Sequence, residues 1–140
     1  MNFFKKIFGP TEPEVQPIEI PKEASPHEVI RIAISSVVQN VGGNCATITT
    51  VDNSGSWIQI MDSVLNCSYP HLEHPESLFP ELFGNKVISG FDGYEPELYV
   101  TLALHHMEHS QLASWIERYF EEVLSVEMNS SDFSIEMEDL

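Results

Sequence analysis

The sequence predicts an α+β domain in which an antiparallel sheet of about five strands is flanked by two long helices and one short helix. Two segments carry apolar residues at helical spacing, several short runs are rich in β-branched and aromatic residues, and turn-forming residues separate those runs. The expected order is α-β-β-(β)-α-β-β-α, with a possible C-terminal edge strand. A chain of 140 residues with 42% hydrophobic residues can bury one core, so we expect a single domain over residues 25–140.

Residues 1–24 predict a flexible, proline-rich extension. Five of the nine prolines fall between residues 10 and 26 and alternate with glutamates, which favours extended, solvated backbone. Residues 3–8 place three phenylalanines and an isoleucine around Lys5 and Lys6. A frayed terminus fits this pattern, and so does one turn of amphipathic helix on a membrane or in a partner groove.

The first long helix is predicted to begin at Ser25. Ser25 can cap the helix, Pro26 suits its first position, and Glu28 can complete a capping box. Apolar residues then recur at steps of three and four as far as Gly42-Gly43, which should end the helix. The positions expected to face the core are Ile30, Ala33, Ile34, Val37, Val38 and Val41.

The middle of the chain predicts strands. Residues 44–51 and 56–62 flank the turn sequence DNSG and should form an antiparallel hairpin, which residues 64–69 can extend as a third strand. A short helix is expected around residues 76–83, closed by Gly84-Asn85. Residues 86–91 and 98–104 predict a second hairpin, with residues 92–96 between them.

The last long helix has the clearest pattern, with Ser110 as its expected cap. Its apolar stripe consists of Leu112, Trp115, Ile116, Tyr119, Phe120, Val123 and Leu124. Beyond it, Phe133, Ile135 and Met137 alternate with polar residues. This alternation predicts a short edge strand or a tail whose acidic side faces water.

The charge of the chain restricts its partners. It has 22 acidic and 6 basic residues, a formal net charge of −16. A surface this negative repels nucleic-acid phosphates and anionic lipid and attracts basic proteins. We expect a polypeptide partner with a basic or extended segment, no nucleic acid, no stable membrane insertion and a possible homodimer. The lack of a long apolar run and of a secretory signal predicts a cytoplasmic protein.

Two cysteines, Cys45 and Cys67, have no metal-ligand pattern around them. The favoured interpretation is that both are reduced, half-buried small hydrophobic residues. A disulfide is the alternative if neighbouring strands bring them together.

Histidines recur in two similar tetrads, HLEH at residues 71–74 and HMEH at residues 106–109. Four imidazoles, from His71, His74, His106 and His109, could hold zinc or nickel. However, neither tetrad falls on a predicted helix, and neither matches the HExxH pattern of metalloproteases. We therefore expect surface histidines and no metal or other cofactor, and keep a metal site as the alternative.

Catalytic motifs are lacking in the sequence. There is no GxSxG, no phosphate-cradling glycine loop and no cysteine beside an identifiable base on the same element. We therefore expect no catalytic residues and no enzyme activity.

Aromatic side chains offer candidate contacts for a partner. Most aromatic residues fall at positions expected to pack in the core. Because a strand has two faces, Trp57 and Tyr99 could instead lie on a face that a partner covers, and Tyr94 lies in the turn between two strands. These three are the predicted partner-binding residues.

The stretches VISGFDGYE (87–95), LYVTLAL (98–104) and LASWIERYF (112–120) carry a resemblance to a known superfamily. Together with the element order over residues 26–126, they resemble the type III secretion chaperone-like fold, which includes the YbjN-type proteins. The resemblance implies a non-catalytic, often dimeric protein that holds an extended segment of another polypeptide against its sheet and hydrophobic grooves.

The expected function is thus a non-catalytic, acidic protein- or peptide-binding module with a chaperone-like role in bacteria. An immunity or antitoxin-like inhibitor of a basic toxin is the first alternative, because an acidic face can plug a basic active site. A small metal-binding protein that uses the histidine tetrads is the second.

Overall fold

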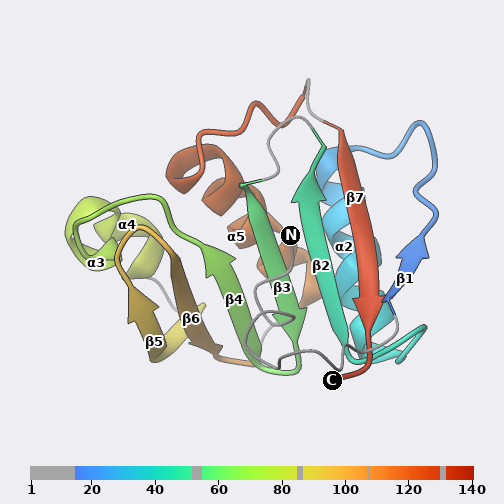
Figure 1. Cartoon of the computed structure of the whole chain (residues 1–140), viewed down its shortest axis with the longest axis horizontal. Coiled ribbons are helices and arrows are strands. Elements are labelled where there is room, and N and C mark those ends of the chain that lie inside the picture. Colours follow the sequence, from blue (N-terminus) through green and yellow to red (C-terminus); the bar gives the residue numbers. More distant parts are fainter. Residues whose placement is uncertain (1–14, 52–54, 85–86, 107, 130–131) are drawn as a thin grey trace.

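A seven-stranded, fully antiparallel sheet forms the centre of the protein (Figure 1). The structure, a computed structural model, describes residues 15–51, 55–84, 87–106, 108–129 and 132–140. The strand order is β1-β7-β2-β3-β4-β6-β5. The strands are β1 (Val15–Ile18), β2 (Cys45–Thr50), β3 (Trp57–Met61), β4 (Val64–Ser68), β5 (Ile88–Glu95), β6 (Tyr99–Leu104) and β7 (Phe133–Glu138).

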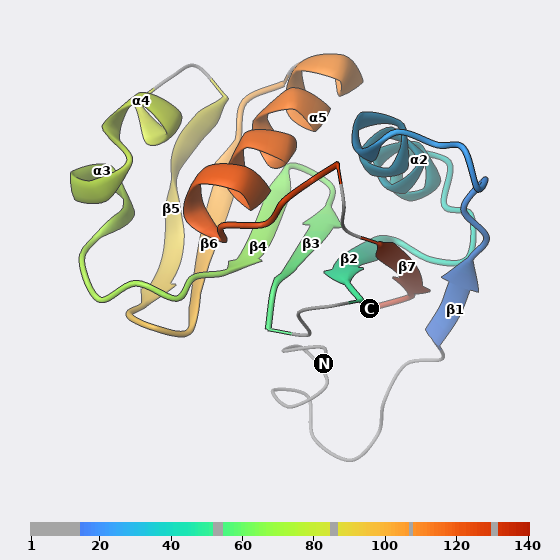
Figure 2. The same ribbon diagram turned by 90° about the horizontal axis from the view of Figure 1, so that it is seen from above.

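The helices within the described residues lie on one face of this sheet (Figure 2). Helices α2 (Pro26–Val38) and α5 (His109–Arg118) pack against each other, and α5 continues as the π-helical turn η1 (Tyr119–Val123). Two four-residue helices, α3 (Pro75–Leu78) and α4 (Pro80–Phe83), lie beside β5. The predicted α+β class is therefore confirmed, whereas the sheet has seven strands instead of about five.

Helix α2 starts as the sequence predicts and ends earlier. The Ser25 hydroxyl accepts from the Glu28 amide at 3.2 Å, and Pro26 takes the first position. At the other end, Asn40 adopts a left-handed conformation (φ 53°), and the Val41 amide donates to the Ser36 carbonyl at 2.8 Å. Asn40 thus takes the C-terminal role that was expected of the glycines. As a result, Val38 and Val41 are exposed, and their predicted place in the core is wrong.

The N-cap of helix α5 lies two residues before the expected one. Glu108 is the N-cap, and its backbone N–H donates to the Gln111 side chain at 3.3 Å, as in a capping box. Ser110 lies inside the first turn, so the prediction of Ser110 as the cap is wrong.

The segment between β4 and β6 differs in detail from the prediction. The expected short helix is divided at Phe79, because Pro80 forces the preceding residue out of helical geometry (φ −129°, ψ 57°). Strand β5 runs on to Glu95, through residues expected to be a loop, and it tolerates Gly90 and Gly93 there because the ladder shifts register beside both.

The two additional strands come from the chain ends. Strand β7 confirms the predicted C-terminal strand, but it is interior, between β1 and β2, so its predicted edge position and the alternative of a solvated tail are wrong. Alternation of polar and apolar residues marks a strand but does not say whether both of its edges are paired. Strand β1 lies within the predicted extension and forms the edge, where Pro17 is tolerated. The expected turns at residues 3–8 and 52–54 lie outside the described residues.

The core lies between the helices and the sheet. Its largest fully buried side chains include Tyr69, Tyr119, Phe120, Ile30, Ile48, Leu102 and Ile116. Hydrogen bonds join α5 and η1 to other elements of this layer: the Trp115 indole donates to the carbonyl of Leu82 in α4, and the Tyr119 hydroxyl donates to the carbonyl of Ser68 in β4. Within the described residues, none of the helices has the length and apolar character needed to cross a bilayer.

Candidate functional site

The helix-free face of the sheet carries an unusual row of polar side chains. We define this face by outward residues of strands β2, β3, β4 and β6, which are Cys45, Thr47, Thr49, Trp57, Gln59, Val64, Asn66, Ser68, Tyr99, Thr101 and Ala103. Their direction follows from the alternation along each strand, because the intervening residues pack in the core under the helices.

Four of these residues form a hydrogen-bonded polar ladder. Thr101 Oγ1 donates to Asn66 Oδ1 (2.9 Å), Asn66 Nδ2 to Gln59 Oε1 (3.1 Å), and Gln59 Nε2 to Thr47 Oγ1 (3.2 Å). The four residues are direct neighbours in the register of β2, β3, β4 and β6. Gln59 and Asn66 are only 0% and 1% exposed. This chain of bonds fixes the side chains in one arrangement across four strands.

Two of the predicted partner-binding residues flank the ladder. Trp57 pairs with Ser68, whose hydroxyl bonds the Trp57 backbone N–H and carbonyl at 3.0 Å, and Ser68 pairs with Tyr99. Trp57 and Tyr99 therefore lie in one row on the helix-free face. Trp57 is 8% exposed, and Tyr99 is half-buried.

Tyr94, the third predicted residue, lies on the opposite face. It pairs with Val100, whose side chain is in the core, and its ring packs edge-on against Tyr69 and His74. Its hydroxyl donates to the Leu72 carbonyl at 3.0 Å. The structure therefore does not bring Tyr94 together with Trp57 and Tyr99.

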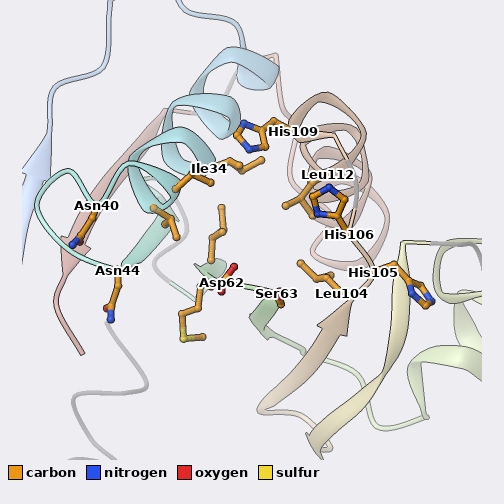
Figure 3. A pocket seen from close by; sticks show the side chains of 14 residues that line it. Ile34, Asn40, Asn44, Asp62, Ser63, Leu104, His105, His106, His109 and Leu112 are labelled. Carbon is orange, nitrogen blue, oxygen red and sulfur yellow. The ribbon is translucent and has the colours of Figure 1, made fainter.

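A pocket opens on the helical side, at the end of the sheet where the β3–β4 turn lies (Figure 3). Its volume is about 570 Å³, within the usual range for ligand sites. The C-terminal end of α2 forms one wall and the start of α5 the other. The apolar lining consists of Ile34, Val37, Val38, Ile60, Met61, Leu104 and Leu112.

Polar groups surround the mouth of this pocket. Asn40 and Asn44 stand on the α2 side, whereas His106 and His109 stand on the α5 side (Figure 3). The Asp62 carboxylate is exposed at the β3–β4 turn between them. The arrangement is an apolar hollow with a solvated polar rim, which suits an apolar group that leaves polar neighbours in water.

The two histidine tetrads lie at opposite ends of helix α5. His71 Nε2 bonds the Val123 carbonyl at 2.8 Å at the end of η1, and His74 caps α3 through its Nδ1. His109 is the first residue of α5, fourteen residues before Val123, a separation of about 21 Å along a helix. The four histidines therefore do not meet. Among the described residues, no group of three or more His, Cys, Asp or Glu side chains is placed to bind a metal ion.

The two cysteines are free and buried on opposite faces of the sheet. They lie on β2 and β4, with β3 between them, a separation of about 9.6 Å that exceeds the reach of a disulfide. Burial raises the pKa of the Cys45 thiol to about 12, and the nearby Glu138 carboxylate adds to the shift. Burial also raises the pKa of Cys67. Neither cysteine has the lowered pKa of a reactive thiol.

Comparison with protein-family models, curated proteins and solved structures gave no match. The resemblance to secretion chaperones therefore stays a prediction.

Sequence reasoning missed the pocket for a physical reason. Its apolar lining comes from Ile34, Ile60 and Leu112, which have the same periodicity as core residues. Whether an apolar side chain meets another residue or an open hollow depends on where helices end in space. Val38 also has the spacing of a core residue, and only its position at the end of α2 leaves it exposed.

Proposed function

We propose that this protein is a non-catalytic binding module that holds an apolar side chain of a basic polypeptide segment in the pocket between α2 and α5. The observation that carries the proposal is an open apolar pocket of about 570 Å³ in a chain of net charge −16. An apolar anchor supplies affinity, and opposite charge supplies orientation and a fast approach.

The mouth of the pocket supports an apolar anchor. Val38 lines the pocket and is 65% exposed. An exposed valine at the opening of an apolar hollow gains free energy when a partner removes it from water, about 25 cal/mol per Å² of apolar surface.

The edges of the sheet make strand addition a poor alternative. Strand β1 has four residues and contains Pro17, and β5 has register shifts at Gly90 and Gly93. A short, proline-containing edge and a bulged edge both hinder pairing with a further strand. The proposal therefore places the partner in the pocket instead of along an edge, and it agrees with the chaperone-like role that the sequence suggests.

A peptide library that varies apolar and charged positions tests this function. The expected result is selection of peptides in which one large apolar residue is flanked by lysine or arginine. Binding of such a peptide, measured by titration, should weaken as salt rises, because the long-range part of the attraction is screened.

Two matched variants locate the site. Val38→Glu adds a charge at the pocket mouth and should abolish peptide binding. Val51→Glu is the control, because Val51 is exposed to a similar extent (60% against 65%) and does not line the pocket. Equal binding by the two variants, or selection of peptides without basic residues, would refute the proposal.

A further inference from the structure

Side chains on the helix-free face are buried although the described helices all lie on the other face (Figure 2). Gln59 is fully buried and Trp57 nearly so, both near the centre of the face. A sheet with helices on one side normally exposes its second face to water. Long side chains such as tryptophan and glutamine reach this degree of burial when something covers them.

The start of β1 brings a suitable segment to this face. Val15 pairs with Glu138 at the edge of the sheet, and the chain enters β1 there. Trp57 and Gln59 lie on β3, three strand spacings away from β1, a distance of about 14 Å. Fourteen residues precede Val15, and an extended chain of that length reaches about 46 Å. The segment is therefore long enough to cross the whole face.

The composition of residues 1–14 is complementary to that face. Phe3, Phe4, Ile7 and Phe8 can cover the aromatic rings of Trp57 and Tyr99. Lys5 and Lys6 are opposite in charge to Glu136 and Glu138, which extend the rows of the face onto β7. Apolar and basic residues are thus concentrated in a segment that is joined to the edge of this surface through β1.

We propose that residues 1–14 dock on the helix-free face and cover Trp57 and the polar ladder, with Phe3, Phe4, Ile7 and Phe8 as the anchors. The segment then acts as an intramolecular ligand of the sheet. This docking is independent of the proposed peptide pocket, which lies on the opposite side of the sheet.

Fluorescence quenching by acrylamide tests the docking in the full chain. The test variant replaces all four anchors by serine: Phe3→Ser, Phe4→Ser, Ile7→Ser and Phe8→Ser. The two tryptophans of the wild-type protein should both resist quenching, because Trp57 and Trp115 are 8% and 2% exposed. In the variant, the quenching constant should rise several-fold for one tryptophan, and adding Trp57→Phe should remove that increase.

The control variant also replaces four apolar residues by serine, at sites already in water. These sites are Val41, Val51, Leu72 and Leu98. Alkylation of Cys67, which is buried under the helices, reports whether each variant keeps its core. If Cys67 becomes reactive in the four-serine variant, the milder pair Phe4→Ser and Phe8→Ser replaces it in the same measurement.

Two results would overturn the proposal. One is quenching of Trp57 that is the same in the anchor variant and the control variant. The other is protection of Trp57 that disappears when the wild-type protein is diluted, because the cover would then be a second copy of the chain.

Discussion

Asn66 uses both ends of its side-chain amide at the centre of the helix-free face. Its Nδ2 donates to Gln59, and its Oδ1 accepts from Thr101. An asparagine in the interior of a strand is unfavourable by propensity. The two bonds explain its place, because a buried amide must satisfy its donors and acceptor.

Replacing Asn66 by alanine should lower the free energy of unfolding by about 2–4 kcal/mol, because Gln59 and Thr101 each lose a buried partner. Urea denaturation measures the change. Thr49→Ala serves as control: Thr49 is half-buried on the same face and lies outside the ladder, so its replacement should change the free energy by less than about 0.5 kcal/mol. A loss below about 1 kcal/mol for Asn66→Ala would mean that the ladder adds little to stability.

At the scale of elements, the two long helices differ in how well local sequence predicts them. The start of α2 follows from Ser25, Pro26 and Glu28, which have one consistent interpretation. At α5 the residues Glu108 and Ser110 compete as caps, and the structure uses Glu108 with Gln111. Local patterns predict that a helix starts, but they do not choose between two capping side chains two residues apart.

A pair of alanine substitutions tests this assignment of caps. Ser25→Ala should destabilise the protein by about 1 kcal/mol, because the Glu28 amide loses its acceptor. Ser110→Ala should have almost no effect, because Ser110 lies within the first turn and alanine favours the helix. Thermal or urea unfolding of both variants gives the comparison, and a larger loss for Ser110→Ala would contradict the assignment.

The strands show a similar limit. The hairpin of β2 and β3 was predictable, because both runs and the turn between them are local. The pairing of β7 with β1 and β2 was not, because it joins residues more than 80 positions apart and no local signal specifies it. Gly43 is consistent with this contact, because a Cβ atom at residue 43 would lie 2.2 Å from the Glu138 carbonyl oxygen and would clash with it. The same limit applies to the candidate site. The strand positions of Trp57 and Tyr99 were predictable from local sequence, whereas the pocket was not, because it depends on where helices end in space.

At the scale of the whole molecule, several cysteine and tyrosine side chains stay protonated to a higher pH in the folded chain than in the unfolded chain. Burial raises the pKa of Cys45 from 9.0 to about 12 and that of Tyr69 from 10.0 to about 12, with Tyr94 and Glu73 adding to the Tyr69 shift. Burial also raises the pKa of Cys67 and of Tyr119. In the unfolded chain these groups ionise at their ordinary values.

Stability should therefore be constant with respect to these groups below pH 9 and fall as the pH rises above it. Each group contributes a slope of about 1.4 kcal/mol per pH unit once its unfolded form has ionised. Urea denaturation between pH 7 and pH 11 measures the loss. Cys45→Ala should reduce the slope of the free energy of unfolding against pH by the contribution of one group, about 1.4 kcal/mol per pH unit. A free energy that stays level to pH 11 would show that these groups ionise without unfolding the core.

The position of β7 has a consequence for how the chain is made. Residues 133–138 are synthesised after every other strand, yet they belong between β1 and β2. While this stretch is still inside the ribosome, the sheet of the emerging protein lacks the strand between β1 and β2. The outer edge of β2 then has no neighbour to pair with. Pairing of β7 is therefore a late event in the folding of the chain, and until then the nascent chain offers that edge to chaperones and to other nascent chains.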